Sequence, residues 1–336
     1  MHAVVLAGGQ GTRLRPLTDT RPKPLLAFMG EPFAVGLLRR LGAAGCTRAT
    51  FLVGPDAAPF AALTPAGRRA GVDVAVRTED RPLDTAGAAR RLSRAGGDGP
   101  MLVCNGDILT DLDYAALVRR HGAAGGVATL ALVRVTDTSS FGVVVCGTGG
   151  RVARFVEKPP PGTVDADTVN AGTYVLEPDV FAAFPGDGPL SFERTVFPGL
   201  VAAGRRVLGV VSDAYWQDLG TPRRYLDGHR AVLEGRCAWP GSPSLRRGDL
   251  VAVDADAVVD PTARLGPLAV VGAGCRIEAG ATVTDAVLHD GVRVGPAARV
   301  RRAILGPGVR VGASATVGPD AVLGDGAVVP PAARVP

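Results

Sequence analysis

The stretch HAVVLAGGQGTRLRPLTDTRPKP, residues 2–24, begins with a nearly continuous apolar run and passes at once into a glycine-rich segment. An apolar, β-branched run such as residues 2–7 is typical of a strand that is buried on both faces of a sheet. The glycines that follow allow the backbone to turn tightly and to present N–H groups to an anion. Arg13 adds a permanently charged fork that suits phosphate oxygens. The stretch therefore predicts an α/β fold that opens with a phosphate-binding loop.

The loop differs from two common nucleotide-binding motifs. It is not a Walker P-loop, because no Gly-Lys-Ser/Thr closes it, and it does not have the G-x-G-x-x-G spacing of dinucleotide-binding folds. Taken alone, a glycine-rich loop is equally compatible with an ordinary turn between a strand and a helix. The surrounding sequence has to decide between these interpretations.

Strand-like and helix-like segments alternate up to about residue 235. The runs that predict strands cover residues 2–7, 49–53, 72–76, 101–104, 127–135, 142–145 and 206–211. Segments with helical periodicity that end in or near glycine cover residues 32–45, 85–96 and 112–122. This alternation predicts an α/β sheet with flanking helices.

A six-residue repeat begins near residue 250. Large aliphatic residues recur at every sixth position, with steps of five before Leu288 and Leu305, and a small residue often stands two positions earlier. The series is Val253, Val259, Leu265, Val271, Ile277, Val283, Leu288, Val294, Val300, Leu305, Val311, Val317, Leu323 and Val329. The pattern resembles the hexapeptide-repeat left-handed β-helix, a solenoid in which three short strands make one coil and each coil is stabilised by its neighbours.

Charge and composition exclude several functional classes. The formal net charge is +5, and the basic residues are dispersed rather than gathered in the stripe typical of nucleic-acid binding. The five cysteines have no C-x-x-C spacing, so neither a disulfide framework nor a zinc site is indicated. No apolar run approaches the ~20 residues of a membrane span, and the start lacks the features of a signal peptide. We therefore expect a cytoplasmic protein that binds neither nucleic acid nor membrane.

Lysine is rare in this chain. The 37 basic residues include only two lysines, Lys23 in RPKPLL and Lys158 in FVEKPP, and each is followed by proline. Arginine and lysine can replace each other on a solvated surface, so the two lysines indicate positions where arginine does not serve. A compact ammonium on a thin stem fits a crowded site that a broad guanidinium does not. Lys23 and Lys158 are therefore candidate functional residues.

Residues 8–24, GGQGTRLRPLTDTRPKP, resemble the signature of the sugar-1-phosphate nucleotidylyltransferases. Further matching segments follow in the family's order: PLDTAGAAR (82–90), VCNGDI (103–108), FGVV (141–144), FVEKP (155–159), NAGTYVLEP (170–178) and YWQDLGTPRRYL (215–226). The resemblance extends into the hexapeptide repeat and is strongest to the mannose-1-phosphate guanylyltransferase branch. It implies a Rossmann-like mixed-sheet nucleotidyltransferase domain over residues 1–237, a linker over 238–249 and a left-handed β-helix over 250–336.

The resemblance also implies roles for individual residues. The expected nucleotide contacts are Leu6, Gly8, Gly9, Gly11, Thr12, Arg13, Glu79, Thr85, Ala86 and Gly87. The expected contacts to the sugar phosphate are Asn105, Gly142, Glu157, Lys158 and Asn170. Asp107 and Asp218 are expected to hold Mg²⁺, and Arg13, Lys23 and Lys158 to be the catalytic cations. Trp216 is compatible with either a core position or a pocket wall.

The implied reaction joins an NTP and a sugar 1-phosphate to give an NDP-sugar and pyrophosphate. The attacking phosphate is already ionised at neutral pH, so no nucleophilic or general-base side chain is expected. GTP with mannose 1-phosphate is the preferred substrate pair. Asp84 departs from the family, which usually has glycine there, and so leaves two interpretations open. Either it caps the following helix, or it favours thymidylyl, uridylyl or adenylyl transfer to glucose 1-phosphate or to a sugar-like cyclitol phosphate.

Two other classes of function are compatible with parts of the sequence. Hexapeptide β-helices often house acyltransferases, which need a catalytic histidine, and His289 is the only histidine within the repeat. A non-catalytic regulatory subunit is the second alternative, and the retention of Arg13, Lys23, Asp107, Lys158 and Asp218 argues against it. The repeat is expected to support a homo-oligomer.

Overall fold

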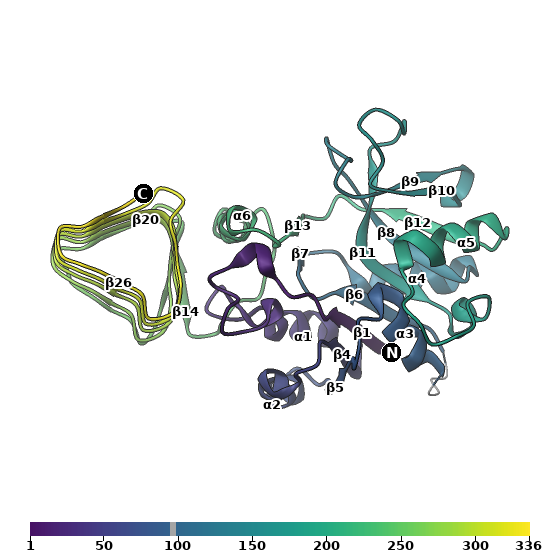
Figure 1. Ribbon diagram of the computed structural model, residues 1–336, viewed down its shortest axis with the longest axis horizontal. Coiled ribbons are helices and arrows are strands. Elements are labelled where there is room, and N and C mark those ends of the chain that lie inside the picture. Colours follow the sequence, from purple (N-terminus) through teal and green to yellow (C-terminus); the bar gives the residue numbers. More distant parts are fainter. Residues whose placement is uncertain (95–98) are drawn as a thin grey trace. The chain divides into compact units, whose positions relative to one another are not determined.

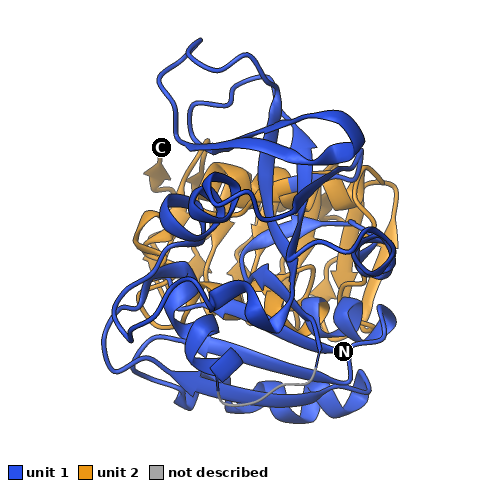
Figure 2. Cartoon of the chain, turned by 90° about the vertical axis from the view of Figure 1, so that its right-hand side faces the viewer, with its two compact units in different colours: residues 1–9, 37–216 blue, residues 10–36, 217–336 orange. Residues whose placement is uncertain are grey.

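The structure is a computed structural model that describes residues 1–94 and 99–336. The chain packs into two compact units, which Figure 2 distinguishes by colour. One unit contains residues 1–9 and 37–216, and the other contains residues 10–36 and 217–336. The glycine-rich stretch is thus divided, because residues 10–36 pack with the unit that contains the repeat. The predicted domain boundaries at residues 237 and 250 remain a prediction.

A mixed sheet forms the centre of the first unit (Figure 1). Its strands are β1 (His2–Ala7), β4 (Arg48–Val53), β5 (Asp73–Thr78), β6 (Met101–Asn105), β8 (Ala128–Arg134), β9 (Gly142–Cys146), β10 (Val152–Glu157), β11 (Thr168–Leu176) and β12 (Val207–Val211). The order is β10-β9-β11-β6-β1-β4-β5, and β8 pairs with β11 and β12. Strands β6, β1, β4 and β5 are mutually parallel, whereas β11 is antiparallel to β6 and β8. The predicted Rossmann-like mixed sheet is confirmed.

The first predicted helical segment contains α1 (Phe33–Ala43), and the other two overlap α3 (Asp84–Arg94) and α4 (Tyr114–Ala124) with boundaries that differ by one or two residues at the ends that the structure describes. Residues 95 and 96 of the second segment lie outside the described residues. The short helices α2 (Leu63–Arg69) and α5 (Phe197–Ala202) complete this unit. Asp113 begins α4 by accepting a hydrogen bond from the Ala116 N–H at 2.8 Å. The core between sheet and helices includes the fully buried rings of Tyr174, Phe192 and Phe197.

The repeat forms a parallel β-helix, which Figure 1 shows end-on as a triangular coil. Its strands are β15 (Val251–Asp254), β16 (Val258–Val259), β17 (Arg264–Leu265), β18 (Ala269–Val271), β19 (Arg276–Ile277), β20 (Thr282–Leu288), β21 (Arg293–Val294), β22 (Arg299–Leu305), β23 (Arg310–Val311), β24 (Thr316–Val317), β25 (Val322–Leu323), β26 (Val328–Val329) and β27 (Arg334–Val335). On one face Val253, Val271, Leu288, Leu305 and Leu323 are stacked in register. These aliphatic columns fill the interior, and the predicted periodicity corresponds to one large inward residue on each side of a coil.

The steps of five residues coincide with one corner of the coil. At these steps β20 and β22 continue through the corner, and Asp285 and Arg302 take positive φ values of 52° and 47°. A six-residue step supplies one more residue for the same turn. The shorter step therefore compresses the corner into a single residue of left-handed conformation.

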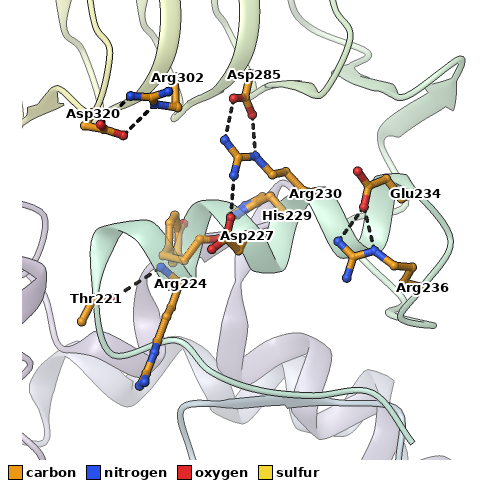
Figure 3. Close-up of polar contacts among 11 residues, drawn as sticks. Thr221, Arg224, Asp227, His229, Arg230, Glu234, Arg236, Asp285, Arg302 and Asp320 are labelled. Carbon is orange, nitrogen blue, oxygen red and sulfur yellow. Dashed lines mark hydrogen bonds and ion pairs between the residues drawn. The ribbon is translucent and has the colours of Figure 1, made fainter. Parts of the chain in front are cut away.

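The remaining elements of the second unit pack on the repeat or beside it. They are β2 (Ala27–Phe28), β3 (Glu31–Pro32), α6 (Pro222–Leu233) and β14 (Leu245–Gly248). Two further short strands complete the chain: β7 (Ile108–Thr110) belongs to the first unit, and β13 (Trp216–Asp218) begins in the first unit and ends in the second. Within the predicted linker, β14 pairs with β15, and Trp239 stacks on Phe33 with ring centroids 4.6 Å apart. Arg230 of α6 pairs with Asp285 at 2.5 Å, and Arg302 pairs with Asp320 at 2.7 Å (Figure 3).

Candidate functional site

A pocket of about 360 Å³ lies at the carboxyl ends of the parallel strands of the first unit. The chain places β4 and β5 on one side of β1 and then returns to place β6 on the other side. In open α/β sheets, ligands bind beyond the carboxyl ends of strands at such a change of direction. The pocket is lined by Leu6, Ala7, Gly8, Gly9, Leu52, Glu79, Pro82, Asp84, Thr85, Asn105 and Asp107. Six of the predicted nucleotide and sugar contacts and one predicted metal ligand thus share one cavity.

Glu79 and Asp84 bring two carboxylates to this pocket. Glu79 Oε2 accepts a hydrogen bond from the Leu83 N–H at 3.0 Å. Burial raises the pKa of Glu79, and this backbone hydrogen bond acts in the opposite direction. Asp84 has φ 61°, a left-handed conformation that glycine adopts most readily. Its carboxylate accepts from the Thr85 N–H at 2.8 Å and pairs with Arg194. Asp84 therefore both begins α3 and lies in the pocket wall.

The predicted base-binding turn, Thr85–Gly87, has one residue that lines the pocket and two that are buried. Thr85 lines the pocket, and its hydroxyl donates to Glu193 at 2.7 Å while accepting from the Phe192 N–H at 2.9 Å. Ala86 and Gly87 are buried, and their N–H groups donate to Leu190 O at 2.8 and 3.1 Å. The backbone donors of these two residues are thus already engaged within the fold. Their contact with a nucleotide remains a prediction.

The predicted sugar-phosphate residues lie on β9, β10 and β11 of the same sheet. Gly142 pairs with Glu157, and a Cβ atom at Gly142 would lie 2.9 Å from Glu157 Oε2 and 2.7 Å from Phe155 Cζ. Only glycine leaves room for the Glu157 carboxylate there. Lys158 Nζ lies 3.6 Å from Glu157 Oε1, and the lysine side chain is 65% exposed. Burial raises the pKa of Glu157, the nearby Glu193 raises it further, and Lys158 lowers it.

Glu193 is a site residue that the sequence did not single out. Its carboxylate accepts hydrogen bonds from Thr85 Oγ1 at 2.7 Å, Ser191 Oγ at 2.9 Å and Tyr174 OH at 3.4 Å. The Tyr174 hydroxyl in turn accepts from Asn170 Nδ2 at 2.7 Å. Glu193 thus joins the predicted base-binding turn to the predicted sugar-binding Asn170. A serine that begins a short helix two residues earlier is the only sequence signal for it.

Trp216 and Asn105 both lie beside strand β11. The Trp216 indole N–H donates to Ala171 O at 2.9 Å, and its ring packs edge-on against Phe141 with centroids 5.1 Å apart. A Cβ at Gly172 would lie 2.5 Å from Asn105 Nδ2, so this glycine allows the Asn105 side chain to approach β11. Trp216 is half-buried and lies beside β11, where its indole contacts Ala171.

Three cations surround Asp218 in the second unit. Lys23 Nζ lies 3.4 Å from Asp218 Oδ1, and Arg224 Nη1 lies 2.9 Å from Oδ2. Arg13 Nη2 is 4.0 Å from Oδ2, and its side chain is 66% exposed. The four residues carry a net positive charge, which favours phosphate groups. Arg224 was missed from the sequence, where it is one arginine among many at the start of α6.

The signature loop, residues 11–24, is folded tightly around Lys23. Gly11 has φ 64°, and a Cβ at this position would lie 3.1 Å from Lys23 Cβ. Thr18 Oγ1 donates to Gly11 O at 2.9 Å and closes the loop. Thr12, Arg13 and Leu14 form a single 3₁₀ turn directly after Gly11. The glycine therefore allows the lysine stem to pass beneath the turn that carries Arg13.

Each of the two units contains one of the two carboxylates that are predicted to hold a metal. Among the described residues no group of three or more His, Cys, Asp or Glu side chains gathers in a way that could hold a metal by itself. Asp107 lines the pocket of the first unit, and Asp218 lies among the cations of the second unit. Each offers hard carboxylate oxygens, and Mg²⁺ sites commonly combine one or two carboxylates with substrate phosphates.

His289 does not have the surroundings of an acyltransferase base. Its side chain is 2% exposed, and its Nε2 lies 3.2 Å from the Tyr225 hydroxyl. Burial lowers the pKa of His289 to about 4. A buried ring that packs against α6 has no access to an acyl donor. Within the described residues, no helix has both the length and the apolar character needed to cross a membrane.

Comparisons with known proteins agree over both parts of the chain. Residues 2–235 match the nucleotidyl transferase family, and residues 248–335 match the GMPPB C-terminal domain. The chain is 39% identical to mannose-1-phosphate guanylyltransferase of Mycobacterium tuberculosis, over 86% of this chain and 80% of that protein. It is 33% identical to probable mannose-1-phosphate guanylyltransferase 1 of Oryza sativa, over 84% of this chain and 80% of that protein. HddC from Yersinia pseudotuberculosis, complexed with GMP-PN, superimposes with a TM-score of 0.57 at 27% identity, over 68% of this chain and 97% of that chain.

Proposed function

The chain belongs to the nucleotidyl transferase family, and we propose that it joins GTP and mannose 1-phosphate to give GDP-mannose and pyrophosphate. The chain is a nucleotidyltransferase, and the choice of substrates is carried by its similarity to mannose-1-phosphate guanylyltransferases of bacteria, plants and insects. That similarity includes the repeat, which matches a C-terminal domain family distinct from the nucleotidyl transferase family.

The proposed reaction needs position and charge more than acid–base chemistry. A phosphate oxygen of mannose 1-phosphate attacks the α-phosphorus of GTP in line, the bond to the β-phosphate oxygen breaks, and pyrophosphate leaves. The nucleophile is already an anion, so no side chain has to remove a proton. Holding two polyanions in line and stabilising the charge that develops on pyrophosphate account for the rate.

The two lysines have separate proposed roles. Lys23 and Arg13 would neutralise the triphosphate, since both already lie beside the Asp218 carboxylate. Lys158 would anchor the sugar phosphate, and its exposed ammonium can reach a ligand without displacing a packed neighbour. Glu157 and Asn170 would accept and donate hydrogen bonds to sugar hydroxyls. The remaining nucleotide contacts of the proposal are Leu6, Gly8, Gly9, Gly11, Thr12, Glu79, Thr85, Ala86 and Gly87.

The proposed metal is Mg²⁺, with Asp107 and Asp218 as its protein ligands. When bound, the ion would neutralise phosphate charge and act as a Lewis acid at the reacting phosphoryl group. Asp218 already balances Lys23 and Arg224, so its removal would leave two partly buried cations without their carboxylate. The proposed location is the cytoplasm, which suits the five free cysteines.

Asp84 supports a second candidate substrate pair. Its carboxylate lines the pocket at a position where the family usually has glycine, and it could favour a base other than guanine. Thymidylyl, uridylyl or adenylyl transfer to glucose 1-phosphate or a cyclitol phosphate is the alternative. The pairing of Asp84 with Arg194 supports a local structural role and hence the guanylyl proposal.

The deciding experiment measures pyrophosphate release for each NTP with each sugar 1-phosphate, in Mg²⁺ and in EDTA. We expect the highest kcat/KM for GTP with mannose 1-phosphate and no turnover in EDTA. A higher kcat/KM for another pair would contradict the proposed substrates but would still support nucleotidyl transfer as the reaction. Pyrophosphate release with no pair at all would contradict catalysis and favour a regulatory subunit.

We also propose a homo-oligomer formed through the β-helix. Val258 and Val328, which are 58% and 66% exposed, are large hydrophobic residues on the face of β16 and β26. Val258→Asp and Val328→Asp should lower the native mass in sedimentation equilibrium without unfolding the chain. A monomeric wild-type protein would refute this proposal.

A further inference from the structure

One corner of the β-helix carries a column of equivalent residues, one from each coil. The column is Ala273, Asp290, Pro307 and Asp325, two positions after the paired residues Val271, Leu288, Leu305 and Leu323. The backbone bonds repeat along it: Gly291 N donates to Ala273 O at 2.8 Å, and Gly326 N donates to Pro307 O at 2.8 Å. Asp290 and Asp325 therefore occupy the same corner, two coils apart.

The two aspartates use their carboxylates differently. Asp290 Oδ1 accepts from the N–H of Ala273 in the preceding coil at 3.1 Å. The residue that precedes Asp325 in the column is Pro307, which has no backbone N–H to donate. Asp325 Oδ2 instead accepts hydrogen bonds from Thr20 Oγ1 at 2.7 Å and from Arg21 Nη2 at 2.5 Å. A carboxylate that belongs to the repeat is thereby turned toward the signature loop.

Neighbouring residues of the same corner also contact this part of the chain. A Cβ at Gly324 would lie 3.1 Å from Pro16 Cβ, so glycine allows the loop to approach the coil. The Arg21 and Asp325 side chains are only 26% and 24% exposed, which weakens solvent screening of their ion pair. Beyond the loop, the Tyr225 hydroxyl contacts both Ala27 O and His289 Nε2. The corner therefore contacts the loop at Pro16, Thr20 and Arg21.

We propose that Asp325 is a positioning residue for nucleotidyl transfer, which it serves by fixing the signature loop. Arg21 lies two residues before Lys23, and Pro16 lies three residues after Arg13. A loop held at these points restricts where the two cations can lie relative to Asp218. The repeat thus contributes to catalysis through a residue that touches no substrate. The kinetic consequence rests on the proposed function, whereas the ordering of the loop does not.

The first test uses the full-length protein without substrate. Hydrogen exchange should be compared for wild type, Asp325→Asn and Asp320→Asn, with mass-spectrometric readout over residues 11–26. Asp320 is a matched control, because it lies on the same coil and pairs with Arg302 of the repeat rather than with a residue of the signature loop (Figure 3). We expect exchange over this segment to rise by roughly 10-fold in Asp325→Asn only, because local opening becomes easier. Equal exchange in all three proteins would overturn the proposal.

The second test follows steady-state pyrophosphate release with the substrate pair that the wild type uses. Asp325→Asn should lower kcat by roughly 10-fold with a smaller change in the KM of the sugar phosphate, because Lys23 and Arg13 act on the triphosphate. Asp320→Asn should keep the wild-type kcat. The exchanged pair Arg21→Asp with Asp325→Arg should recover part of the loss, whereas Arg21→Asp alone should not.

The results separate the two proposals. Faster exchange in Asp325→Asn together with wild-type kcat would show that Asp325 orders the loop but that catalysis does not need this order. That result would overturn the positioning role. A wild type that releases no pyrophosphate with any pair would contradict the proposed function, and the exchange result would still decide whether Asp325 orders the loop. Failure of the exchanged pair to recover activity, with both single variants folded, would count against the ion pair as the cause.

Discussion

The Nζ atom of Lys23 lies 3.4 Å from Asp218 Oδ1, across 195 residues of sequence. Both side chains are largely buried, at 10% and 18% exposure, whereas Arg13 on the same carboxylate is 66% exposed. Burial makes this position sensitive to the shape of the cation as well as to its charge. In a chain that uses arginine almost everywhere, this steric restriction is a physical reason for one of its two lysines.

Lys23→Arg is expected to lower kcat by about 10-fold or more, equivalent to ~1.4 kcal/mol of activation barrier. A guanidinium at this position has to fit where the ammonium lies 3.4 Å from Asp218 Oδ1, on a side chain that is only 10% exposed. Steady-state pyrophosphate release measures the effect, and thermal unfolding shows whether the variant is folded. Lys158→Arg is the matched comparison, and its 65% exposed side chain predicts a smaller loss. Equal losses in the two variants would contradict the steric explanation.

Much of the fold could be predicted from the sequence, since periodicity reports directly on burial. The buried strands and the aliphatic columns of the repeat are local patterns. Strand β11 was not predicted as a strand, because Asn170 and Gly172 interrupt its apolar run and its antiparallel partners are remote in sequence. The division into units was also not predictable, because contacts such as Thr20 with Asp325 span 305 residues.

The candidate site could be predicted only where a motif carried the information. Gly8, Gly9, Glu79 and Asp107 line one pocket, whereas Gly11, Thr12 and Arg13 of the same motif are not among its lining residues. Glu193 and Arg224 were missed because each looks like an ordinary charged residue in the first turn of a helix. Glu193 matters because it contacts Thr85 and Tyr174. Arg224 matters because it contacts Asp218. Such contacts depend on tertiary structure.

Gly142→Ala is expected to raise the KM for the sugar 1-phosphate by about 10-fold, because the new methyl group would displace the Glu157 carboxylate. The added Cβ would lie 2.9 Å from Glu157 Oε2 and 2.7 Å from Phe155 Cζ. Gly147→Ala in the loop that follows β9 is the control, since its nearest neighbour would be Arg151 O at 3.8 Å. An unchanged KM in Gly142→Ala would show that Glu157 does not contact the sugar.

Glu157→Gln is expected to stabilise the protein increasingly as pH rises. Burial raises the folded-state pKa of Glu157 above its ordinary value of 4.5, so the folded protein retains this proton at a pH where the unfolded chain has lost it. Wild-type stability therefore falls as pH rises from 4.5 through the raised pKa and then levels off. The melting temperatures of the two proteins should keep a constant difference below pH 4.5 and shift in favour of the variant above it. A constant difference at every pH would contradict the assignment.

Acid should destabilise the second unit through two buried histidines. Burial lowers the pKa of His289 to about 4 and that of His229 to about 3, from 6.5 in the unfolded chain. Below pH 6.5 the unfolded chain takes up protons that the folded protein excludes, so stability is fully present above pH 6.5 and falls as pH decreases toward the folded pKa. Each histidine contributes a slope of up to ~1.4 kcal/mol per pH unit in this range.

His289→Gln isolates one of these contributions, because glutamine keeps a polar group beside the Tyr225 hydroxyl but does not titrate. Urea unfolding of wild type and variant at intervals from about pH 7 to about pH 4.5 should show a shallower decline for the variant. The difference between the two curves should change by roughly 2 kcal/mol in favour of the variant as pH falls across this range, whatever the cost of the substitution at neutral pH. His229→Gln should behave in the same way, and the double variant should be shallower than either. Parallel curves for wild type and His289→Gln would mean that this ring is protonated in the folded state as readily as in the unfolded chain, which its burial between Tyr225 and the β-helix corner makes energetically unfavourable.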